Sequence, residues 1–373
     1  MRFLIHALSV TNASGRHVLL GHLKGLAERT VGRHEYVVLW HPGNRDIVRD
    51  LGPNVAWVQC PAGCAHWVGR AAWERMFLAR VCRARGIDGA FTPAGHAMPL
   101  SGIPQIVFCQ NPWALVGGLS RGLAGHLKAA LQRRSYRHAV RRADVMVFNS
   151  RFMEAAYRSN AGQAPRNVFI AHQGVDEETF AAAACSSVAR VPGLIVSVSA
   201  MAPHKDVGTL LRAFAILRDR FCFSARLKLV GAWPDRRYET AMRALMEELG
   251  VARSVELCGH VSREDLHAAY ASASVFALFS RCESFGIPAV EAQAFGTPVV
   301  GADCCATREI GGDGGLYVAP GDAESAARVM HEALTRDDRW RELSARAKAN
   351  AERFRWAACA ADMAAAFERL ACL

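Results

Sequence analysis

The chain of 373 residues lacks any apolar run as long as the roughly 18 residues that a membrane-spanning helix needs. Its first segment, MRFLIHALSVTNASG, has a short apolar core but neither the longer apolar stretch nor the cleavage site of a signal peptide. This segment is more typical of a first buried strand. We therefore expect a cytoplasmic protein that does not cross a membrane.

The chain also lacks a C-x-x-C pair, although it contains twelve cysteines. The closest pairs are Cys60 with Cys64 and the adjacent Cys304 and Cys305. Others, such as Cys109 and Cys258, lie inside apolar runs. This spacing indicates neither a metal site nor a disulfide framework, and it favours buried thiols in a reducing compartment.

Acidic residues are scarce in the first half of the chain. Residues 1–175 contain 8 Asp and Glu against 22 Lys and Arg, a net charge of +14, whereas the remainder has a net charge of −3. Such an asymmetry predicts an anionic partner for the first half, either a membrane surface, a phosphorylated substrate or nucleic acid. Nucleic acid is the least favoured of these, because the basic segment lacks interleaved aromatic residues and no nucleic-acid-binding module is recognisable.

Short apolar runs alternate with amphipathic stretches along the whole chain. The runs are almost continuously apolar, as buried parallel strands are, with seven expected strands in the first half and six in the second. Helical periodicity is clearest at Val207, Leu210, Leu211, Phe214 and Leu217. This alternation predicts an α/β protein of two domains with parallel sheets.

We place the domain boundary between the segments NVFIAHQGVD and GLIVSVSA. The first domain then covers residues 1–175 and the second covers 176–356. The intervening segment EETFAAAACSSVARVPG, residues 177–193, is interpreted as a linker. Ligands of such domains bind at the carboxyl ends of the strands, so the residues that follow strands are the candidates for function.

One such segment is SRCESFGIPAVEAQAFGTPVVGAD, which begins at Ser280. Pro288 suits the first turn of a helix, and Gly286 allows the backbone to come close to a ligand. The start of that helix would favour a diphosphate. Glu283 and Glu291 flank the turn, where each can accept hydrogen bonds from hydroxyl groups of one ligand. The spacing fits equally well with helix electrostatics plus one solvated glutamate.

The same segment resembles the E-x7-E signature of the retaining glycosyltransferases of GT-B fold, family 4. The resemblance extends over VSAMAPHKDVGTLLRAFAIL and TREIGGDGGLYVAPGD and, more weakly, over RRADVMVFNSRFM in the first half. It implies two Rossmann-like domains facing a central cleft, an N-terminal one for the acceptor and a C-terminal one for a nucleotide sugar. The end of the chain resembles the last helix of the family, so residues 357–373 are expected to return to the first domain.

The resemblance assigns roles to the matching residues of the second half. Glu283 is expected to contact hydroxyl groups of the transferred sugar, Glu291 to bind the nucleotide ribose, and Lys205 to stabilise the leaving diphosphate. Gly15, in the first half, would approach the diphosphate as a small residue. The remaining donor-binding residues that the resemblance implies are His204, Gly259, His260, Val261, Ser284, Phe285, Gly286, Ile287 and Arg308.

The donor site departs from the family pattern at Ala200, where many members have an arginine that contacts the diphosphate. His204, Arg281 and Arg308 are candidates to replace this cation. His204 fits as well with a solvated loop residue that has no role in binding.

The acceptor side departs from the pattern at Gln110 and Asn111, where many members have a histidine. Both residues, together with His96, are expected to face the acceptor. Asn111 is the third expected catalytic residue, because its amide can orient the sugar or an attacking hydroxyl, although it cannot act as a base. An ordinary Asn-Pro turn and a loop histidine without a role are equally compatible with these residues.

The expected function is retaining transfer of a hexose from a UDP-, GDP- or ADP-linked donor to a saccharide or lipid-linked saccharide, in cell-surface polysaccharide or lipopolysaccharide synthesis. We expect no cofactor and no metal, since GT-B enzymes usually need none and the chain has no D-x-D motif. The alternatives are a non-catalytic protein that binds sugar nucleotides and a nucleic-acid-binding protein. Nothing in the sequence supports an epimerase or a phosphorylase.

Residues 121–142 form the most basic segment, and two interpretations of it remain open. An apolar edge of leucines and Tyr136 beside the arginines is typical of a helix that rests on an anionic membrane. The same pattern fits an ordinary solvated helix of the first domain. The residues concerned are Leu123, Leu127, Leu131, Tyr136, Arg133, Arg134, Arg137, Arg141 and Arg142.

Overall fold

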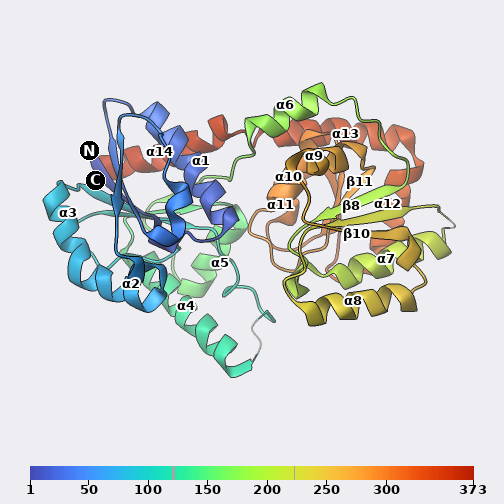
Figure 1. The fold of residues 1–373 in the computed structure, drawn as a ribbon, viewed down its shortest axis with the longest axis horizontal. Helices are drawn as coiled ribbons and strands as arrows, with labels where there is room; N and C mark the ends of the chain where they lie inside the picture. Colours follow the sequence, from blue (N-terminus) through green and yellow to red (C-terminus); the bar gives the residue numbers. More distant parts are fainter. Residues whose placement is uncertain (120–121, 222) are drawn as a thin grey trace. The chain divides into compact units, whose positions relative to one another are not determined.

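The computed structural model describes residues 1–119, 122–221 and 223–373. The chain divides into an N-terminal unit, Met1–Gly174 with Trp356–Leu373, and a C-terminal unit, Val175–Arg355 (Figure 1). The boundaries expected from the sequence, after residues 175 and 356, differ from these by one residue each. Among the described residues, no helix combines the length and the apolar character needed to cross a membrane.

The N-terminal unit is built on a seven-stranded parallel sheet with the order β3-β2-β1-β4-β5-β6-β7. The order of strand addition reverses between β1 and β4, which is where doubly wound sheets bind ligands. The strands are β1 Arg2–His6, β2 Glu35–Trp40, β3 Val55–Gln59, β4 Gly89–Thr92, β5 Gln105–Cys109, β6 Val145–Phe148 and β7 Val168–Ile170.

Helices cover both faces of this sheet (Figure 1). The last helix of the chain packs along the first, and glycines make the close approach possible, because a Cβ at Gly25 would lie 2.2 Å from the Cβ of Ala360. The helices are α1 Ala13–Arg29, α2 Trp67–Trp73, α3 Ala79–Arg85, α4 Gly122–Arg142, α5 Arg151–Ala161 and α14 Trp356–Ala371, with a π-helical segment Glu74–Leu78 between α2 and α3.

The C-terminal unit repeats this architecture with a six-stranded parallel sheet of order β10-β9-β8-β11-β12-β13. Its strands are β8 Leu194–Val198, β9 Arg226–Val230, β10 Val255–Gly259, β11 Val275–Leu278, β12 Val299–Ala302 and β13 Gly315–Val318. Its helices are α6 Glu177–Cys185, α7 Val207–Asp219, α8 Arg236–Glu248, α9 Arg263–Ser272, α10 Ile287–Ala294, α11 Thr307–Gly311, α12 Ala323–Thr335 and α13 Asp337–Glu352.

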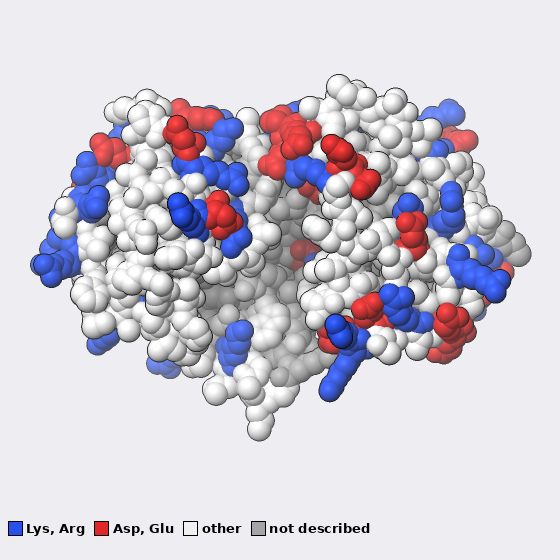
Figure 2. Space-filling model, in the orientation of Figure 1, with Lys and Arg blue, Asp and Glu red and all other residues white. Residues whose placement is uncertain are grey.

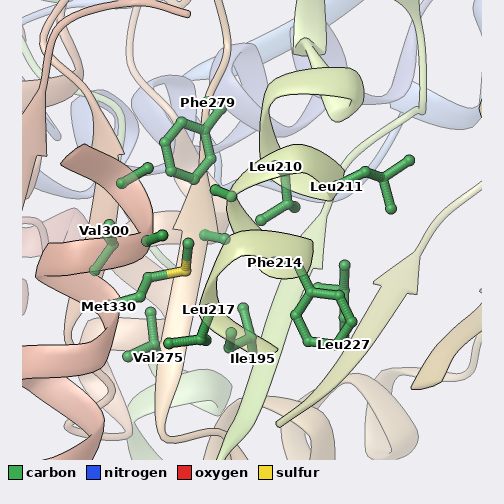
Figure 3. Close-up of a cluster of buried hydrophobic side chains, with 14 of the residues drawn as sticks. Ile195, Leu210, Leu211, Phe214, Leu217, Leu227, Val275, Phe279, Val300 and Met330 are labelled. Carbon is green, nitrogen blue, oxygen red and sulfur yellow. The ribbon is translucent and has the colours of Figure 1, made fainter. Parts of the chain in front are cut away.

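The apolar face of α7 lies in the core of the C-terminal unit. Leu211, Phe214 and Leu217 are fully buried there, with Val275 of β11 and Met330 of α12 in the same cluster (Figure 3). The helical periodicity of this segment therefore predicted the face that is buried. This core holds α7 against the sheet and thereby positions the loop that precedes it.

The expected strands all form, but only residues 186–193 of the expected linker lie outside helices and strands. Residues 177–185 of that segment fold as α6, with Thr179 and Phe180 buried. Two glutamates in the first turn suit the positive end of a helix, and the alanines that follow have the highest helix propensity. The guanidinium of Arg355 lies 3.9 Å from the centre of the Phe180 ring. This tertiary contact of α6 could not be predicted from the composition of the segment.

The basic segment forms α4, but Tyr136 does not belong to its exposed edge. The Tyr136 ring is buried and stacks on Tyr157 with 4.7 Å between ring centres. The exposed apolar residues of α4 are Leu123, Leu127 and Leu131. Residue 121, the first of the predicted membrane-contact segment, lies outside the described residues.

The cysteines of the described chain are all free, and most of them are buried. Cys109, at the end of β5, is fully buried as expected. Cys258 was expected in the core and is instead partly exposed, because β10 is the edge strand of its sheet. Cys304 and Cys305 are also partly exposed.

Candidate functional site

Two loops of the C-terminal unit meet at the carboxyl ends of β8 and β11, the neighbouring strands between which the order of strand addition reverses. The first loop ends with Lys205 and the second contains Glu283. The Lys205 Nζ lies 2.7 Å from Glu283 Oε2, and the two side chains are 19% and 16% exposed. The structure therefore brings together, as an ion pair at the rim of the sheet, two residues that are 78 positions apart in the sequence.

The backbone around Lys205 is held by contacts to the Glu283 loop. Asp206 has a left-handed backbone with φ of 49° and caps the start of α7. Its Oδ2 accepts hydrogen bonds from Thr209 Oγ1 at 2.9 Å and from Arg281 Nε at 2.7 Å. The N–H of Arg281 also donates to the carbonyl of His204 at 2.8 Å. The two loops are thus joined through both backbone and side chains.

The turn after Glu283 has the conformation that its glycine and proline predict. Gly286 has φ of 95°, and Pro288 occupies the first turn of α10. A Cβ at Gly286 would lie 3.3 Å from a side-chain atom of Leu278 and 3.4 Å from one of Glu283. Glycine therefore fits both the positive φ of this position and the limited room beside these two side chains. Phe285 points into the core, where its ring makes an edge contact with Phe354 at 5.3 Å. Only the backbone of Phe285 is therefore placed to contact a ligand.

Glu291 lies in α10 and has a partner that sequence reasoning missed. The hydroxyl of Tyr270, on α9, donates to Glu291 Oε2 at 2.8 Å. Burial and the neighbouring carboxylate raise the pKa of Tyr270 well above its usual range, so the phenol keeps its proton. Nothing local marks Tyr270, because 21 residues separate it from Glu291. One oxygen of Glu291 is thus held in place by a buried donor.

Many family members have an arginine where this chain has Ala200, and the cations expected to replace it here mostly form ion pairs with other residues. Arg308 forms a two-pronged ion pair with Asp303, at 2.9 and 2.7 Å, and Arg281 is bound to Asp206. Burial and the nearby Lys205 charge lower the pKa of His204, so it is neutral near pH 7. Lys205 is paired as well, with Glu283, but its side chain is 19% exposed against 56% for Arg281 and 59% for Arg308, so it is the most buried of these three cations.

The segment after β10 contains the other expected donor-binding residues. Gly259 has φ of 64°, and its carbonyl accepts a hydrogen bond from Gly231 N at 2.7 Å. His260 is exposed, whereas Val261 packs into the core beside Val230. Of these three expected residues, His260 is the one whose side chain is fully available to a ligand.

The remaining predicted residues lie in the N-terminal unit. Gly15 is in the first turn of α1, and its N–H donates to Asn12 Oδ1 at 2.6 Å. Asn111 is exposed after β5 and accepts a hydrogen bond from Trp113 N at 3.0 Å, which is the local turn that Asn-Pro suggested. Gln110 donates to the carbonyl of Pro93 at 3.3 Å.

His96 follows β4 and adjoins a buried group of charged side chains. His6 Nε2 lies 2.9 Å from Glu74 Oε1, with Arg70 3.8 Å from the same oxygen. Burial, followed by the charge of His6, lowers the pKa of His96. His96 is therefore not a freely solvated loop histidine, and no local pattern in the sequence indicated its neighbours Glu74 and Arg70.

Two family models match the chain. The model for glycosyl transferases group 1 matches residues 189–354, and the model for glycosyltransferase family 4 matches residues 21–179. The first match contains the Lys205–Glu283 pair as well as Glu291 and Tyr270. The second covers most of the N-terminal unit.

Curated relatives are similar over parts of their length. The chain is 31% identical over 181 residues to the O-antigen chain mannosyltransferase B of Escherichia coli, which is 48% of this chain and 46% of that protein. It is 28% identical over 272 residues to a D-inositol 3-phosphate glycosyltransferase of Corynebacterium aurimucosum, 69% of this chain and 64% of that protein. The chain therefore spans less than two thirds of either relative.

The fold is shared over the whole chain with solved structures. Anabaena Alr3699/HepE in complex with UDP-glucose superposes with a TM-score of 0.73 at 17% identity, covering 100% of both chains. At this identity the likeness shows the fold alone.

Proposed function

Because the chain belongs to the group 1 glycosyl transferases of GT-B fold, we propose that it transfers a hexose from a nucleotide-sugar donor to a saccharide or lipid-linked saccharide. The observation that supports this most is the Lys205–Glu283 pair at the reversal point of the C-terminal sheet. A diphosphate needs a cation and a sugar needs carboxylate acceptors, and this pair offers both within 2.7 Å.

Lys205 and Glu283 neutralise each other in the structure described here. When a donor binds, the ammonium of Lys205 would turn to the diphosphate and stabilise the charge that grows on it as the sugar–phosphate bond breaks. The Glu283 carboxylate would then accept hydrogen bonds from sugar hydroxyls. We propose retention of the anomeric configuration, with the leaving phosphate accepting the proton of the acceptor. The anomer of the product, determined by NMR, tests this step.

Ligand-induced stabilisation is the first test of the proposed function. A thermal-shift series with UDP, GDP and ADP identifies the base, because a ligand that binds only the folded state raises the melting temperature. The matching glucose and mannose nucleotides are then tested for turnover, mannose first because one relative is a mannosyltransferase. We propose that no metal is required, so transfer should survive EDTA.

The same series separates the alternatives. A non-catalytic sugar-nucleotide-binding protein would be stabilised by a nucleotide yet release no free nucleoside diphosphate with any sugar acceptor. A nucleic-acid-binding protein would be stabilised by RNA or DNA and by none of the nucleotides. Either outcome would contradict the proposed transfer.

Tyr270 is expected to tune the binding of the donor through Glu291, the proposed ribose ligand. Replacing Tyr270 with phenylalanine removes the 2.8 Å hydrogen bond and leaves the carboxylate free to rotate. We expect KM for the donor to rise roughly fivefold, the equivalent of about 1 kcal/mol, with kcat within twofold of the original. Steady-state kinetics with varied donor measures both.

Tyr36→Phe is the matched control for Tyr270→Phe. Tyr36 is a buried tyrosine of the N-terminal unit whose hydroxyl lies 2.8 Å from Thr30 Oγ1. The Tyr36→Phe variant should leave KM for the donor unchanged. If Tyr270→Phe alters kcat but not KM, then Glu291 does not bind the donor in the way proposed here.

We also propose that α4 brings the protein to the inner face of an anionic membrane. Leu123, Leu127 and Leu131 are 92%, 63% and 60% exposed and recur every four residues, so they form one apolar stripe. Lys128 and Arg134 are exposed on the same helix. Elsewhere on the N-terminal unit the basic side chains are dispersed, with acidic ones among them on the face that Figure 2 shows.

Vesicle sedimentation tests this contact. The protein should sediment with vesicles that contain phosphatidylglycerol and remain in solution with phosphatidylcholine alone, with binding reduced by added salt. The variant Leu123→Ser/Leu127→Ser should lose most of the binding. Equal sedimentation of the variant and the original protein would assign the contact to another surface.

A further inference from the structure

A buried ionic group lies at the carboxyl edge of the N-terminal sheet, at the point where the order of strand addition reverses. His6 is the last residue of β1, and His96 follows the neighbouring strand β4. Glu74 Oε1 reaches the same place, 2.9 Å from His6 Nε2 and 3.8 Å from Nε of Arg70 in α2. Doubly wound sheets bind their ligands at this edge. The group therefore has the same position in its sheet as the proposed lysine–glutamate pair has in the C-terminal sheet.

Stability alone does not account for charged side chains at this place. His6 is fully buried and Glu74 nearly so, and the adjoining Leu8 and Cys64 belong to a buried apolar cluster. Removing charged groups from water costs free energy, and a well-packed apolar set of similar volume is often as stable as a buried ion pair. A role in binding therefore explains these charges better than a role in folding.

The helix that carries Glu74 is distorted at this residue. α2 ends at Trp73, and Glu74–Leu78 is the one π-helical segment among residues 1–119, 122–221 and 223–373. Such single π turns are rare and occur frequently at functional sites. The distortion coincides with the only acidic residue between positions 62 and 85.

Two hydrogen-bond acceptors of the group are open to a ligand. Glu74 Oε1 is fully buried against His6, whereas Oε2 has no hydrogen-bond partner in the described part of the chain, and the side chain is 10% exposed. His96 Nδ1 lies 3.2 Å from the carbonyl oxygen of Ala94. Because a carbonyl can only accept, Nδ1 carries the proton of the neutral ring and Nε2 remains an acceptor.

The charges of the group suit hydroxyl groups as ligands. Burial by itself would raise the pKa of Glu74, but the contact with His6 outweighs this effect and lowers the pKa, so the carboxylate is ionised near pH 7. Burial, followed by the charge of His6, lowers the pKa of His96, which is therefore neutral. Arg70 donates one hydrogen bond, to the carbonyl of Leu8 at 3.2 Å, and its side chain is 18% exposed, so further N–H groups of its guanidinium are available.

We propose that Glu74 and Arg70 bind the acceptor saccharide through two neighbouring hydroxyl groups of one sugar ring. Glu74 Oε2 accepts a hydrogen bond from one hydroxyl, and the guanidinium of Arg70 donates to the next. His6 holds the other carboxylate oxygen and so positions Glu74. The carboxylate would repel a phosphate, and an alkyl chain would leave both groups without partners. The proposal rests on the proposed function, because the sugar bound here is the acceptor of that transfer.

Steady-state kinetics with varied acceptor is the first part of the test. The probes are methyl glycosides of the common hexoses, and the best acceptor among them is used with the nucleotide sugar held at saturation. Glu74→Gln keeps the shape of the side chain but replaces its charged oxygen. We expect KM for this glycoside to rise at least about tenfold, as for the loss of a hydrogen bond to a charged group. KM for the donor, and the slow hydrolysis of the donor without acceptor, should stay within twofold.

Monodeoxy forms of the same glycoside are the second part, because they separate binding from a structural role. Removal of the hydroxyl that Glu74 binds should raise KM of the original chain about tenfold and have little further effect in Glu74→Gln, where the interaction is already lost. Arg70→Lys, which keeps the charge but loses the planar fork, should show the same coupling to the neighbouring hydroxyl. If every deoxy glycoside has the same effect in the variants as in the original chain, the proposal is wrong.

Glu154→Gln is the matched control for Glu74→Gln. Glu154 also pairs with an arginine four residues away, Arg158 at 3.5 Å, on helix α5 of the same unit. This variant should leave KM for the glycoside unchanged. Melting temperatures show whether each variant is folded. Should Glu74→Gln not fold, the series with Arg70→Lys decides the proposal, because the Arg70 side chain is the more exposed of the two.

The outcomes separate this proposal from the proposed function. Transfer with an unchanged acceptor KM in folded Glu74→Gln and Arg70→Lys overturns the proposal and leaves the proposed function intact. Absence of transfer and of nucleotide binding in the original chain overturns the proposed function. If no glycoside accepts a sugar, saturation-transfer NMR with the same glycosides decides the proposal. Contact with the original chain that is lost in Glu74→Gln supports a saccharide site, and absence of contact with the original chain overturns it.

Discussion

Replacing Lys205 with alanine is expected to lower kcat by roughly 10²–10³-fold, the range seen when one preorganised group that stabilises developing charge is removed. Lys205 is the most buried of the three cations considered for the diphosphate, with a side chain 19% exposed against 56% for Arg281 and 59% for Arg308. The variant also leaves the Glu283 carboxylate without its counter-charge beside the proposed diphosphate position. Nucleotide binding should therefore weaken together with kcat, as kinetics and thermal shift would measure.

Lys228→Ala is the matched control for Lys205→Ala. Lys228 also pairs with a glutamate, Glu256, at 3.2 Å, but this pair lies on the neighbouring strands β9 and β10 and is more exposed. Exposed pairs contribute little to stability, so this variant should keep its fold and its transfer rate. Equal activity of Lys205→Ala and Lys228→Ala would remove Lys205 from the proposed mechanism.

Replacing Glu283 with glutamine is expected to lower kcat by about 10²-fold while the affinity for the nucleoside diphosphate is maintained or increased. The loss follows from the weaker hydrogen bonds that a neutral amide makes to sugar hydroxyls, at roughly 1.5–3 kcal/mol for a bond to a charged group. The maintained affinity follows from the release of Lys205, whose ammonium is bound to Glu283 Oε2 at 2.7 Å in the free protein. In Glu283→Gln, kcat should thus fall without a loss of affinity for the nucleoside diphosphate.

Calorimetric titration with the matching diphosphate and steady-state kinetics together test this separation. The double variant Lys205→Ala/Glu283→Gln should bind the diphosphate better than Lys205→Ala, because it removes the repulsion between the carboxylate and the phosphates. Glu256→Gln, the partner of the control lysine, should change neither quantity. If Glu283→Gln weakens diphosphate binding as much as it lowers kcat, the carboxylate does not act on the sugar.

Much of the architecture could be read from local patterns. Buried parallel strands are apolar throughout, so each expected strand was visible as a short apolar run, and the periodicity from Val207 to Leu217 indicated the buried face of α7. The Gly-x-Pro turn before α10 follows from the conformational preferences of two residues. These features depend on near neighbours in the chain, which is why they could be predicted.

Other features depended on contacts between distant segments. The segment 177–193 was expected to be a linker, but contacts with distant residues hold its helix α6, such as that of Phe180 with Arg355 and that of Thr179 with Arg263. Tyr136 was expected on an exposed edge, but the stacking partner that buries it, Tyr157, lies on another helix. Hydrophobic pattern alone cannot distinguish an exposed aromatic residue from one that a remote helix covers.

The candidate site shows the same division. The sequence by itself determined that Lys205, Glu283 and Glu291 follow or flank strands of one doubly wound sheet, because motif and periodicity are local properties. Only the tertiary structure decided that Lys205 pairs with Glu283 and that Tyr270 holds Glu291. Pairing of charges and sharing of protons depend on distances of a few ångströms between strand ends, and those distances are set by the order of strands in the sheet rather than by their order in the chain.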